Sequence, residues 1–308
     1  MLFAGAALQR TDAFLARISQ RVRAGGPTLS YEFFPPRDQE ARERIREIVS
    51  RAAPDFATVT YGAGGSTREH TFETALELNS VLPCAHHLTI LRHTTRELEG
   101  IVGRIWDAGL RNLIAIRGDR PKGLDRFPST PDGPGHAEEL VALIKRVAPR
   151  ADVIVAGYPE GHKEAVSAGH DIEVLRRKQD LGADLIFTQL FYENDVFYRW
   201  RDACLRAGIT IPIVPGLMAV SSPRQLRKIS ELCGAALPQG LMRQLDGRDD
   251  HAEEHARISA EWCIRQAVDL LSNDVPGIHI YCLNRLHPAI EVGQHVGRVL
   301  GRGTHGKR

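Results

Sequence analysis

One carboxylate in the sequence stands in an apolar segment, where an unpaired charge is costly. The segment is Ser30-Tyr31-Glu32-Phe33-Phe34-Pro35-Pro36, and it predicts a short buried strand that the two prolines end. Glu32 would lie near the carboxyl end of this strand. Because burial disfavours the ionised form, we expect the pKa of Glu32 to be raised toward the range in which a general acid works. The alternative is a solvated glutamate on an edge strand.

The elements that would position Glu32 follow a regular pattern along the chain. Short β-branched runs alternate with helical stretches such as 38–51 and 94–108, as in βα units around a parallel sheet. Eight such units favour a single closed (β/α)8 TIM barrel, an α/β fold, with an extra helical insertion at 222–277 before the last strand. We expect this catalytic domain to span 1–300 and a disordered tail to follow at 301–308. The predicted strands are 29–34, 56–61, 85–90, 112–117, 152–158, 184–189, 211–216 and 278–283.

Polar residues stand at the ends of these predicted strands. In such a barrel the chemistry gathers at the carboxyl ends of the strands. Seven of the eight predicted strands end in polar residues, and packing alone gives no reason for them, so we expect one site at this mouth. His86 and His87 alternate along their strand, so that only one of them can face the site. The strand-end residues are Glu32, Thr60 and Tyr61, His87 and Thr89, Arg117-Gly118-Asp119, Tyr158, Gln189, and Asn284-Arg285.

Composition and charge argue against several classes of protein. The 308 residues are 43% hydrophobic and 25% charged, which is typical of a soluble globular protein. The formal net charge of +2 and the lack of a basic block interleaved with aromatic residues argue against nucleic-acid binding. No apolar run reaches 18 residues and the apolar start is too short for an export signal, so we expect a cytoplasmic protein without a membrane partner. The five cysteines form no C-x-x-C pair and predict packing residues.

Three other motifs have weaker chemical interpretations. Gly62-Ala63-Gly64-Gly65-Ser66 could cradle a phosphate, but it lacks the spacing of the known glycine-rich phosphate loops. His251 and His255 have the i, i+4 spacing of metal ligands without the H-E-x-x-H order, so we expect a solvated helix there and no metal site. Arg117-Gly118-Asp119 could be a strand end with a surface ion pair, although its place after the fourth predicted strand favours a role in the site.

Taken together, the strand-end segments resemble the methylenetetrahydrofolate reductase family, in its bacterial form that consists of the catalytic domain alone. Each segment is a weak pattern by itself. Their order along nearly the whole chain, each at a predicted strand end, makes the resemblance specific. The matching segments are Glu32-Phe33-Phe34-Pro35-Pro36, Val59-Thr60-Tyr61-Gly62-Ala63, His87-Leu88-Thr89, Arg117-Gly118-Asp119, Tyr158-Pro159-Glu160, Thr188-Gln189, Pro215-Gly216 and Leu283-Asn284-Arg285.

The resemblance implies a flavoprotein oxidoreductase that reduces 5,10-methylenetetrahydrofolate to 5-methyltetrahydrofolate in one-carbon metabolism and methionine biosynthesis. FAD would be the cofactor and NAD(P)H the hydride donor, in a ping-pong mechanism in which both substrates use one site in turn. The partners would be these small molecules and further copies of the chain in a homo-oligomer. Opening of the methylene bridge needs a proton on N10, for which Glu32 is the matching general acid. Asp119 would stabilise the cationic iminium and tune the flavin potential.

The resemblance also assigns binding roles residue by residue. Thr60 would contact the nicotinamide, and Gln189 would serve nicotinamide and pterin in turn through its rotatable amide. Asp119, Gln225 and Arg285 would contact the folate, and Arg285 is suited to a carboxylate or carbonyl group of that substrate. The residues that would bind FAD are Tyr61, Ala63, His87, Arg117, Gly118, Asp119, Ala137, Tyr158, His162, Ala165, Asp171, Arg177 and Lys178.

The chain departs from the family pattern at a few places in its binding regions. Arg177 and Lys178 would supply cations for the FAD pyrophosphate. Val174, however, stands where some bacterial members have a polar FAD contact, and Ile229 stands where they have an aromatic residue against the second substrate. The loop 120–135 is longer than the family pattern leads us to expect.

Two alternatives to the flavoenzyme stay open. One is a flavin-free methylenetetrahydrofolate reductase with direct hydride transfer, for which Val174 leaves room. The other is an accessory folate-binding subunit that needs an electron-delivering partner. A flavin spectrum of the purified protein would favour the flavoenzyme over the first. Oxidation of NAD(P)H with an artificial acceptor would exclude dependence on a partner.

Overall fold

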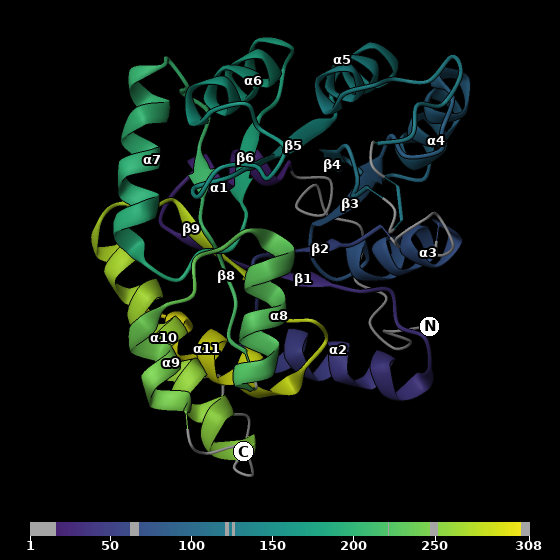
Figure 1. The fold of residues 1–308 in the computed structure, drawn as a ribbon. Coiled ribbons are helices and arrows are strands. Elements are labelled where there is room, and N and C mark those ends of the chain that lie inside the picture. The colour runs from purple at the N-terminus through teal and green to yellow at the C-terminus, as the bar shows by residue number, and fades with distance from the viewer. Residues whose placement is uncertain are drawn as a thin grey trace.

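The chain forms a ring of parallel strands surrounded by helices (Figure 1). The structure is a computed structural model, and it describes residues 17–61, 68–120, 123–124, 127–220, 222–246 and 252–302. The strands are β1 (Thr28–Phe33), β2 (Phe56–Val59), β3 (Cys84–Thr89), β4 (Asn112–Ile116), β5 (Asp152–Gly157), β6 (Leu185–Thr188), β7 (Ile213–Val214), β8 (Gly216–Leu217) and β9 (Gly277–Tyr281). The helices are α1 (Ile18–Arg23), α2 (Gln39–Ala52), α3 (Arg68–Asn79), α4 (Thr95–Asp107), α5 (Ala137–Val147), α6 (Ala168–Asp180), α7 (Asn194–Arg206), α8 (Pro223–Cys233), α9 (Gln239–Leu245), α10 (Ala252–Ser272) and α11 (Leu286–Val299).

One short segment of chain closes the ring. The strand order is β7-β6-β5-β4-β3-β2-β1-β9-β8, and only Pro215 separates β7 from β8. On the β6 side the Ile186 amide donates to the Pro212 carbonyl at 2.9 Å, and on the β9 side the His279 amide donates to Pro215 at the same distance. Because proline has no amide hydrogen, the ladder breaks at Pro215 and the chain passes from one neighbour to the other. The predicted strand 211–216 is therefore two strands, and the predicted α/β barrel is confirmed.

The predicted helices begin and end at residues suited to those positions. Asp38 caps α2, where its carboxylate accepts a hydrogen bond from the Ala41 amide at 2.7 Å. Thr94 forms a capping box with Glu97 at the start of α4. Gly109 follows α4 with a φ of 91° and leads into β4, as a glycine after a helix end does. Such local signals explain why the sequence locates α2 and α4 closely.

Helix α1 closes the amino end of the barrel, although the sequence pattern does not predict it. Ile18 packs among apolar side chains inside the barrel, including Phe56. The Ile18 amide donates to the Asn112 side chain at 2.8 Å. The Ser19 amide donates to the Asp152 carboxylate at 2.7 Å. Side chains of β4 and β5 thus satisfy amides that the first turn of a helix leaves without partners. The polar strand-end residues lie at the opposite, carboxyl end of the barrel.

The predicted insertion before the last strand contains α8, α9 and α10. Its own apolar core includes Leu226, Leu241 and Ile258. His255 lies one helical turn before Ile258 on α10 and is 2% exposed. The prediction of a solvated helix is therefore wrong for His255, because it lies on the face of α10 that packs into this core. His251 lies outside the described residues.

The described chain ends after α11. Arg302, which falls in the predicted tail, pairs with the Asp55 carboxylate. Arg21 of α1 pairs with the same carboxylate at 2.8 Å. Residues 303–308 lie outside the described residues. Nowhere in the described part of the chain does a helix combine the length and the apolar character that a membrane span needs.

His86 and His87 lie on opposite sides of β3, as their alternation predicts. His86 packs behind the strand against Phe72 of α3 and against Tyr61, with ring centres 6.4 and 6.0 Å apart. Burial, together with the neighbouring His87, lowers the pKa of His86 from 6.5 to about 3. The folded barrel therefore holds this ring in its neutral form at neutral pH.

We predict that the free energy of unfolding falls as the pH drops from 6.5 toward 3, because the unfolded chain takes up the proton that buried His86 does not. This one group contributes a slope of up to about 1.4 kcal/mol per pH unit. Urea unfolding across this range should show that His86→Leu removes that part of the slope. The control Phe72→Leu, beside the same ring, should lower stability and keep the slope. An unchanged slope in His86→Leu would contradict the burial argument.

Candidate active site

The side chain of Glu32 enters the barrel near its carboxyl mouth. Ser30 and Glu32 face the interior of the barrel. Tyr31 and Phe33 alternate with them and pack outward in the core beneath the helices. The Tyr31 hydroxyl donates to the Ala289 carbonyl of α11 at 2.7 Å and fixes β1 against that helix. The Glu32 side chain is 17% exposed, so it is largely withdrawn from water yet open to the mouth.

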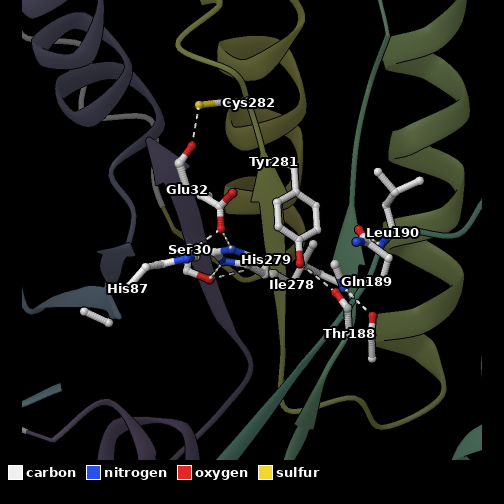
Figure 2. A network of polar contacts seen from close by, with 12 residues as sticks. Ser30, Glu32, His87, Thr188, Gln189, Leu190, Ile278, His279, Tyr281 and Cys282 are labelled. Atoms are coloured by element: carbon white, nitrogen blue, oxygen red, sulfur yellow. Dashed lines mark hydrogen bonds and ion pairs between the residues drawn. The ribbon is translucent and has the colours of Figure 1, made fainter. Parts of the chain in front are cut away.

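Two imidazole rings lie against the Glu32 carboxylate (Figure 2). Its Oε2 is 3.2 Å from His87 Nε2 on β3 and 3.8 Å from His279 Nε2 on β9. Burial acts to raise the pKa of Glu32, but the two rings together outweigh burial and lower the pKa to about 2. The predicted raised pKa is therefore wrong, because the sequence shows the apolar neighbours of Glu32 along β1 and not the rings that two other strands bring to it.

His279 is a site residue that the motifs do not identify. Its Nδ1 is 2.8 Å from Ser30 Oγ. Its ring stacks on Phe187 with centres 4.5 Å apart and planes at 17°. Tyr281 stands edge-on to it at 5.0 Å and donates its hydroxyl to the Thr188 carbonyl at 2.7 Å. The alternation of His279 and Tyr281 along the last strand is the sequence signal that could have indicated two inward-facing side chains.

Other predicted substrate residues lie around the same mouth. Gln189 follows β6, and its Oε1 accepts a hydrogen bond from the Leu190 amide at 2.9 Å. Thr60 follows β2, and its buried Oγ1 has no hydrogen-bond partner among the described residues. Asp119 is exposed beyond the end of β4. The mouth thus carries an amide, a hydroxyl and a carboxylate on three different strands.

The structure brings together Gln225 and Arg285, which were both predicted to contact the folate and no other ligand. The Arg285 guanidinium donates to Gln225 Oε1 at 3.2 Å. Asn284 fixes the turn before Arg285, since its side chain accepts from the Phe34 amide and donates to the Phe34 carbonyl, both at 2.9 Å. The end of β9 is therefore tied to the end of β1, which carries Glu32.

Several predicted cofactor residues gather around β4, β5, α5 and α6. Arg117 pairs with Glu164 at 2.5 Å. Arg177 pairs with Glu138 at 3.3 Å. Lys178 is buried on α6. The structure thus collects three cations in one region, and carboxylates already face the two guanidinium groups.

The loop after β5 is held onto α6 by further residues of the predicted cofactor set. Burial lowers the pKa of Lys178, and the charge of Asp171 acts against this shift. The Asp171 carboxylate accepts from the His162 amide at 3.2 Å. The His162 ring meets Tyr158 edge-on with centres 4.7 Å apart.

Gly118 allows β4 to turn closely past β3. Its φ is 91°, and a Cβ built there would lie 2.8 Å from Thr89 Oγ1. The backbone between Arg117 and Asp119 therefore needs glycine at this position. Larger residues would push the strand end and Asp119 away from the mouth.

The remaining predicted cofactor residues are more scattered. The Tyr61 hydroxyl is 3.1 Å from His93 Nε2. Ala137 begins α5. Ala165 lies in the loop before α6. Ala63 lies outside the described residues. His87, also assigned to the cofactor, lies beside Glu32. Among the described residues no three His, Cys, Asp or Glu side chains form a group that could hold a metal ion.

The sequence matches known proteins over most of its length. A family model described as methylenetetrahydrofolate reductase matches residues 17–297. The chain is 34% identical over 278 residues to 5,10-methylenetetrahydrofolate reductase of Escherichia coli strain K12, across 89% of this chain and 92% of that protein. It is 31% identical over 301 residues to methylenetetrahydrofolate reductase (NADH) 1 of Zea mays, across 92% of this chain and 51% of the maize protein.

A solved structure supports the fold. It is an uncharacterized protein from Clostridium thermocellum, described as binding two copies of 5-methyl-5,6,7,8-tetrahydrofolic acid. The TM-score is 0.61 at 14% sequence identity, with coverage of 92% of this chain and 98% of that chain. At this identity the likeness shows the shared fold alone.

We predict that Glu32→Gln changes the titration of His279 in the ligand-free protein. Burial lowers the pKa of His279, and the Glu32 carboxylate acts against that shift. Without the carboxylate the pKa falls further, so the neutral ring should persist to more acid pH. Heteronuclear NMR of histidine-labelled protein measures the titration, with Glu99→Gln on the surface as the control. A wild-type titration of His279 in the Glu32 variant would contradict the coupling.

Proposed function

The chain belongs to the methylenetetrahydrofolate reductase family, and we propose that it reduces 5,10-methylenetetrahydrofolate to 5-methyltetrahydrofolate with FAD as cofactor and NAD(P)H as hydride donor. The observation that carries this proposal is the Glu32 carboxylate between two imidazoles at the carboxyl mouth. The reaction adds one hydride to the methylene carbon and one proton to N10. This cluster can hold that proton and deliver it.

Glu32 is the proposed final donor of the proton to N10. In the ligand-free site its carboxylate is ionised, because the rings of His87 and His279 lower its pKa to about 2. A bound folate covers the exposed part of the side chain, which strengthens the effect of burial and raises the pKa again. The bound substrate therefore favours the protonated form of Glu32 at the moment it is needed.

The residues around β4, β5 and α6 fit a flavin dinucleotide in kind. FAD, when bound, would supply the redox group that carries a hydride between the nicotinamide and the folate. Arg117, Arg177 and Lys178 would supply cations for its pyrophosphate, and Asp171 would be an acceptor for its hydroxyl groups. The buried Oγ1 of Thr60, which has no partner among the described residues, is a polar atom that a ligand at the mouth can satisfy.

Other residues at the mouth have the remaining roles, which are charge stabilisation and substrate binding. Asp119 places a negative charge where the opening methylene bridge develops positive charge. Gln189 binds its own backbone in the ligand-free site, and rotation of its amide frees a donor and an acceptor for nicotinamide and pterin in turn. Arg285, oriented by Gln225, presents a guanidinium group to a carboxylate or carbonyl of the folate.

One observation favours a second candidate, a flavin-free reductase with direct hydride transfer from nicotinamide to folate. Arg117 and Arg177 already face Glu164 and Glu138, so a pyrophosphate must displace carboxylates before it gains their charge. The apolar Val174 lies on the same helix as Arg177. The accessory-subunit alternative gains nothing from the site, which retains the full set of proposed catalytic groups.

The purified protein should show a flavin spectrum that NAD(P)H bleaches and 5,10-methylenetetrahydrofolate restores. Glu32→Gln should keep the first step and slow the second by about 10²–10⁴-fold, because only the second step needs the proton. Stopped-flow absorbance in single turnovers measures both steps. Equal loss of both in Glu32→Gln would refute the acid role. A colourless protein that still reduces the folate would establish the flavin-free candidate.

The carboxylate partners of the cations predict the effect of two substitutions on FAD affinity. Glu164→Gln should tighten FAD binding, because it removes the group that competes with pyrophosphate for Arg117. Arg117→Ala should weaken FAD binding by about tenfold or more, as expected for a lost charge-assisted hydrogen bond. Fluorescence titration of apoprotein with FAD measures both.

The matched control for these variants is Glu99→Gln, which breaks a comparable exposed pair with Arg146 at 2.6 Å on the surface. It should leave FAD affinity unchanged. Weaker FAD binding in Glu164→Gln would show that the Arg117–Glu164 pair shapes the site rather than competing with the cofactor.

A further inference from the structure

We propose that Glu160 and Lys163, in the loop after β5, are positioning residues for the folate that act through α8 and Gln225. The inference rests on the proposed function and deepens it. Near the amino end of α8, Gln225 Oε1 accepts a hydrogen bond from Arg285 at 3.2 Å. Glu160 and Lys163 contact the carboxyl end of the same helix and the turn that follows it. Each end of α8 is therefore tied to a different part of the mouth.

Helix α8 connects two separate sides of the mouth. One end lies beside the residues after β9, and the other lies beside the loop after β5. In the ring, β6, β7 and β8 stand between these two strands. Figure 1 shows α8 in front of β8, inside the outer row of helices to which α5, α6 and α7 belong. The helix thus joins residues predicted to contact the folate to a loop that carries the predicted cofactor residues His162 and Ala165.

Lys163 satisfies a carbonyl that α8 leaves without an amide partner. At the end of the helix, the amides of Gly234 and Ala235 both donate to the Ser230 carbonyl. The Lys163 ammonium donates to the next carbonyl, that of Glu231. The last carbonyls of a helix carry partial negative charge, so a cation is favourable at this place.

Gly234 makes room for the lysine side chain. Its φ is 76°, a conformation that favours glycine after a helix end. A Cβ built on Gly234 would lie 3.2 Å from both Cγ and Cε of Lys163. The alkyl chain of Lys163 therefore lies directly over the glycine on its way to the Glu231 carbonyl.

Glu160 binds the turn that follows the helix. The Ala236 amide donates to Glu160 Oε2 at 2.8 Å. The cation of the loop thus meets a carbonyl and its anion meets an amide, and we call these two contacts the α8 clamp. Glu160 is half-buried and Lys163 is exposed. Because water screens an exposed charge more strongly, the Glu160 contact is expected to contribute more.

The packing of α8 alone resists a roll about the helix axis only weakly. Its buried residues are Pro223, Leu226 and Ser230, which form one narrow strip. The strand before it, β8, has two residues. A roll would swing Gln225, and Ile229 one turn later, away from their present direction. The clamp at the carboxyl end opposes this roll and keeps Gln225 directed toward Arg285.

The loop that carries the clamp has an anchor of its own. The His162 amide donates to the Asp171 carboxylate of α6 at 3.2 Å. The Ala165 amide donates to the His162 carbonyl at 2.9 Å. Loss of the clamp should therefore free α8 and leave the loop, with its predicted cofactor residues, in place. The clamp is expected to affect the folate and not FAD.

The alternative is that the clamp adds stability and nothing else. A contact of that kind would lower the amount of folded protein and weaken both half-reactions alike. Positioning of Gln225 has a selective effect instead, because Gln225 is predicted to contact the folate and not the nicotinamide. The two half-reactions therefore distinguish the two roles.

Four variants and one control test the clamp. Glu160→Ala removes the carboxylate, whereas Glu160→Gln keeps an acceptor for the Ala236 amide. Lys163→Met removes the charge but keeps an alkyl chain over Gly234, and Lys163→Arg keeps a cation. The control is Glu193→Ala. Burial raises the pKa of Glu160 and the charge of Glu193 adds to that shift, so Glu193 lies nearby, yet its side chain makes no capping hydrogen bond to α7.

Stopped-flow reoxidation of the reduced protein is measured over a range of 5,10-methylenetetrahydrofolate concentrations. In Glu160→Ala the half-saturating concentration should rise about tenfold, as expected for a lost hydrogen bond to a charged group. In Lys163→Met it should rise about threefold, as expected for an exposed cation at a helix end. Glu160→Gln and Lys163→Arg should recover most of the folate affinity, and Glu193→Ala should keep it.

Flavin reduction by NAD(P)H and FAD affinity should be unchanged in all five variants. An unchanged half-saturating folate concentration in Glu160→Ala would overturn the proposal. Equal losses in the two half-reactions would also overturn it and leave a structural role.

A double substitution tests whether the clamp acts through Gln225. In a Gln225→Ala background, Glu160→Ala should lose most of its effect on the half-saturating folate concentration, because the side chain that the clamp positions is already gone. The same rise in both backgrounds would overturn action through Gln225.

Hydrogen–deuterium exchange of the ligand-free protein separates this inference from the proposed function. Mass spectrometry should show faster exchange across 222–236 in Glu160→Ala than in wild type, with α6 unchanged. If wild type fails to react with the folate, the proposed function fails, and the exchange result alone decides on the clamp. Unchanged exchange across 222–236 would overturn it.

Discussion

Burial of the Glu32 carboxylate inside a barrel is the constraint on which the site depends. A buried charge is stable only when other polar groups come to it. The groups here are His279 on β9, the strand beside β1, and His87 on β3, which is two strands away. In a flat sheet two strands would be about 10 Å apart. The curvature of the closed barrel turns both side chains inward, so that His87 Nε2 lies 3.2 Å from the carboxylate. The electrostatics of the site is thus a property of the closed barrel and not of any one strand.

The sequence predicts those features of the fold that local chemistry determines. Asp38 and Thr94 are capping residues, and the helices after them begin where expected. The β-branched runs locate the strands because strands of a parallel barrel are buried on both faces. Polar residues at the strand ends locate the mouth, since apolar packing gives them no other reason to be there. Gln225 and Arg285, assigned by resemblance, lie within hydrogen-bond distance of each other.

The features that the sequence does not predict depend on partners far along the chain. Ser30 and His279 are 249 residues apart, and Ser19 of α1 and Asp152 are 133 residues apart. The sign of the pKa shift of Glu32 follows from such distant neighbours, so the apolar surroundings along β1 gave the wrong direction. The burial of His255 also depends on distant residues, because the core of the insertion forms only when α8, α9 and α10 pack together. β7 and β8 are separate strands because the segment around Pro215 pairs with β6 on one side and with β9 on the other.

The ladder of strands breaks at Pro215, between β7 and β8. This break, which we call the seam, affects how the mouth can deform. Strands β7 and β8 contribute two residues each to the sheet, so few ladder bonds hold the ring closed there. Gln225 lies on α8, which follows β8, whereas Arg285 follows β9, the strand that pairs with β8. The strands from β1 to β6 pair continuously and form an arc that carries Glu32 and the residues predicted to bind the cofactor. We infer that the sheet deforms most easily at the seam, so that this wall of the mouth can shift while the arc that carries Glu32 stays rigid.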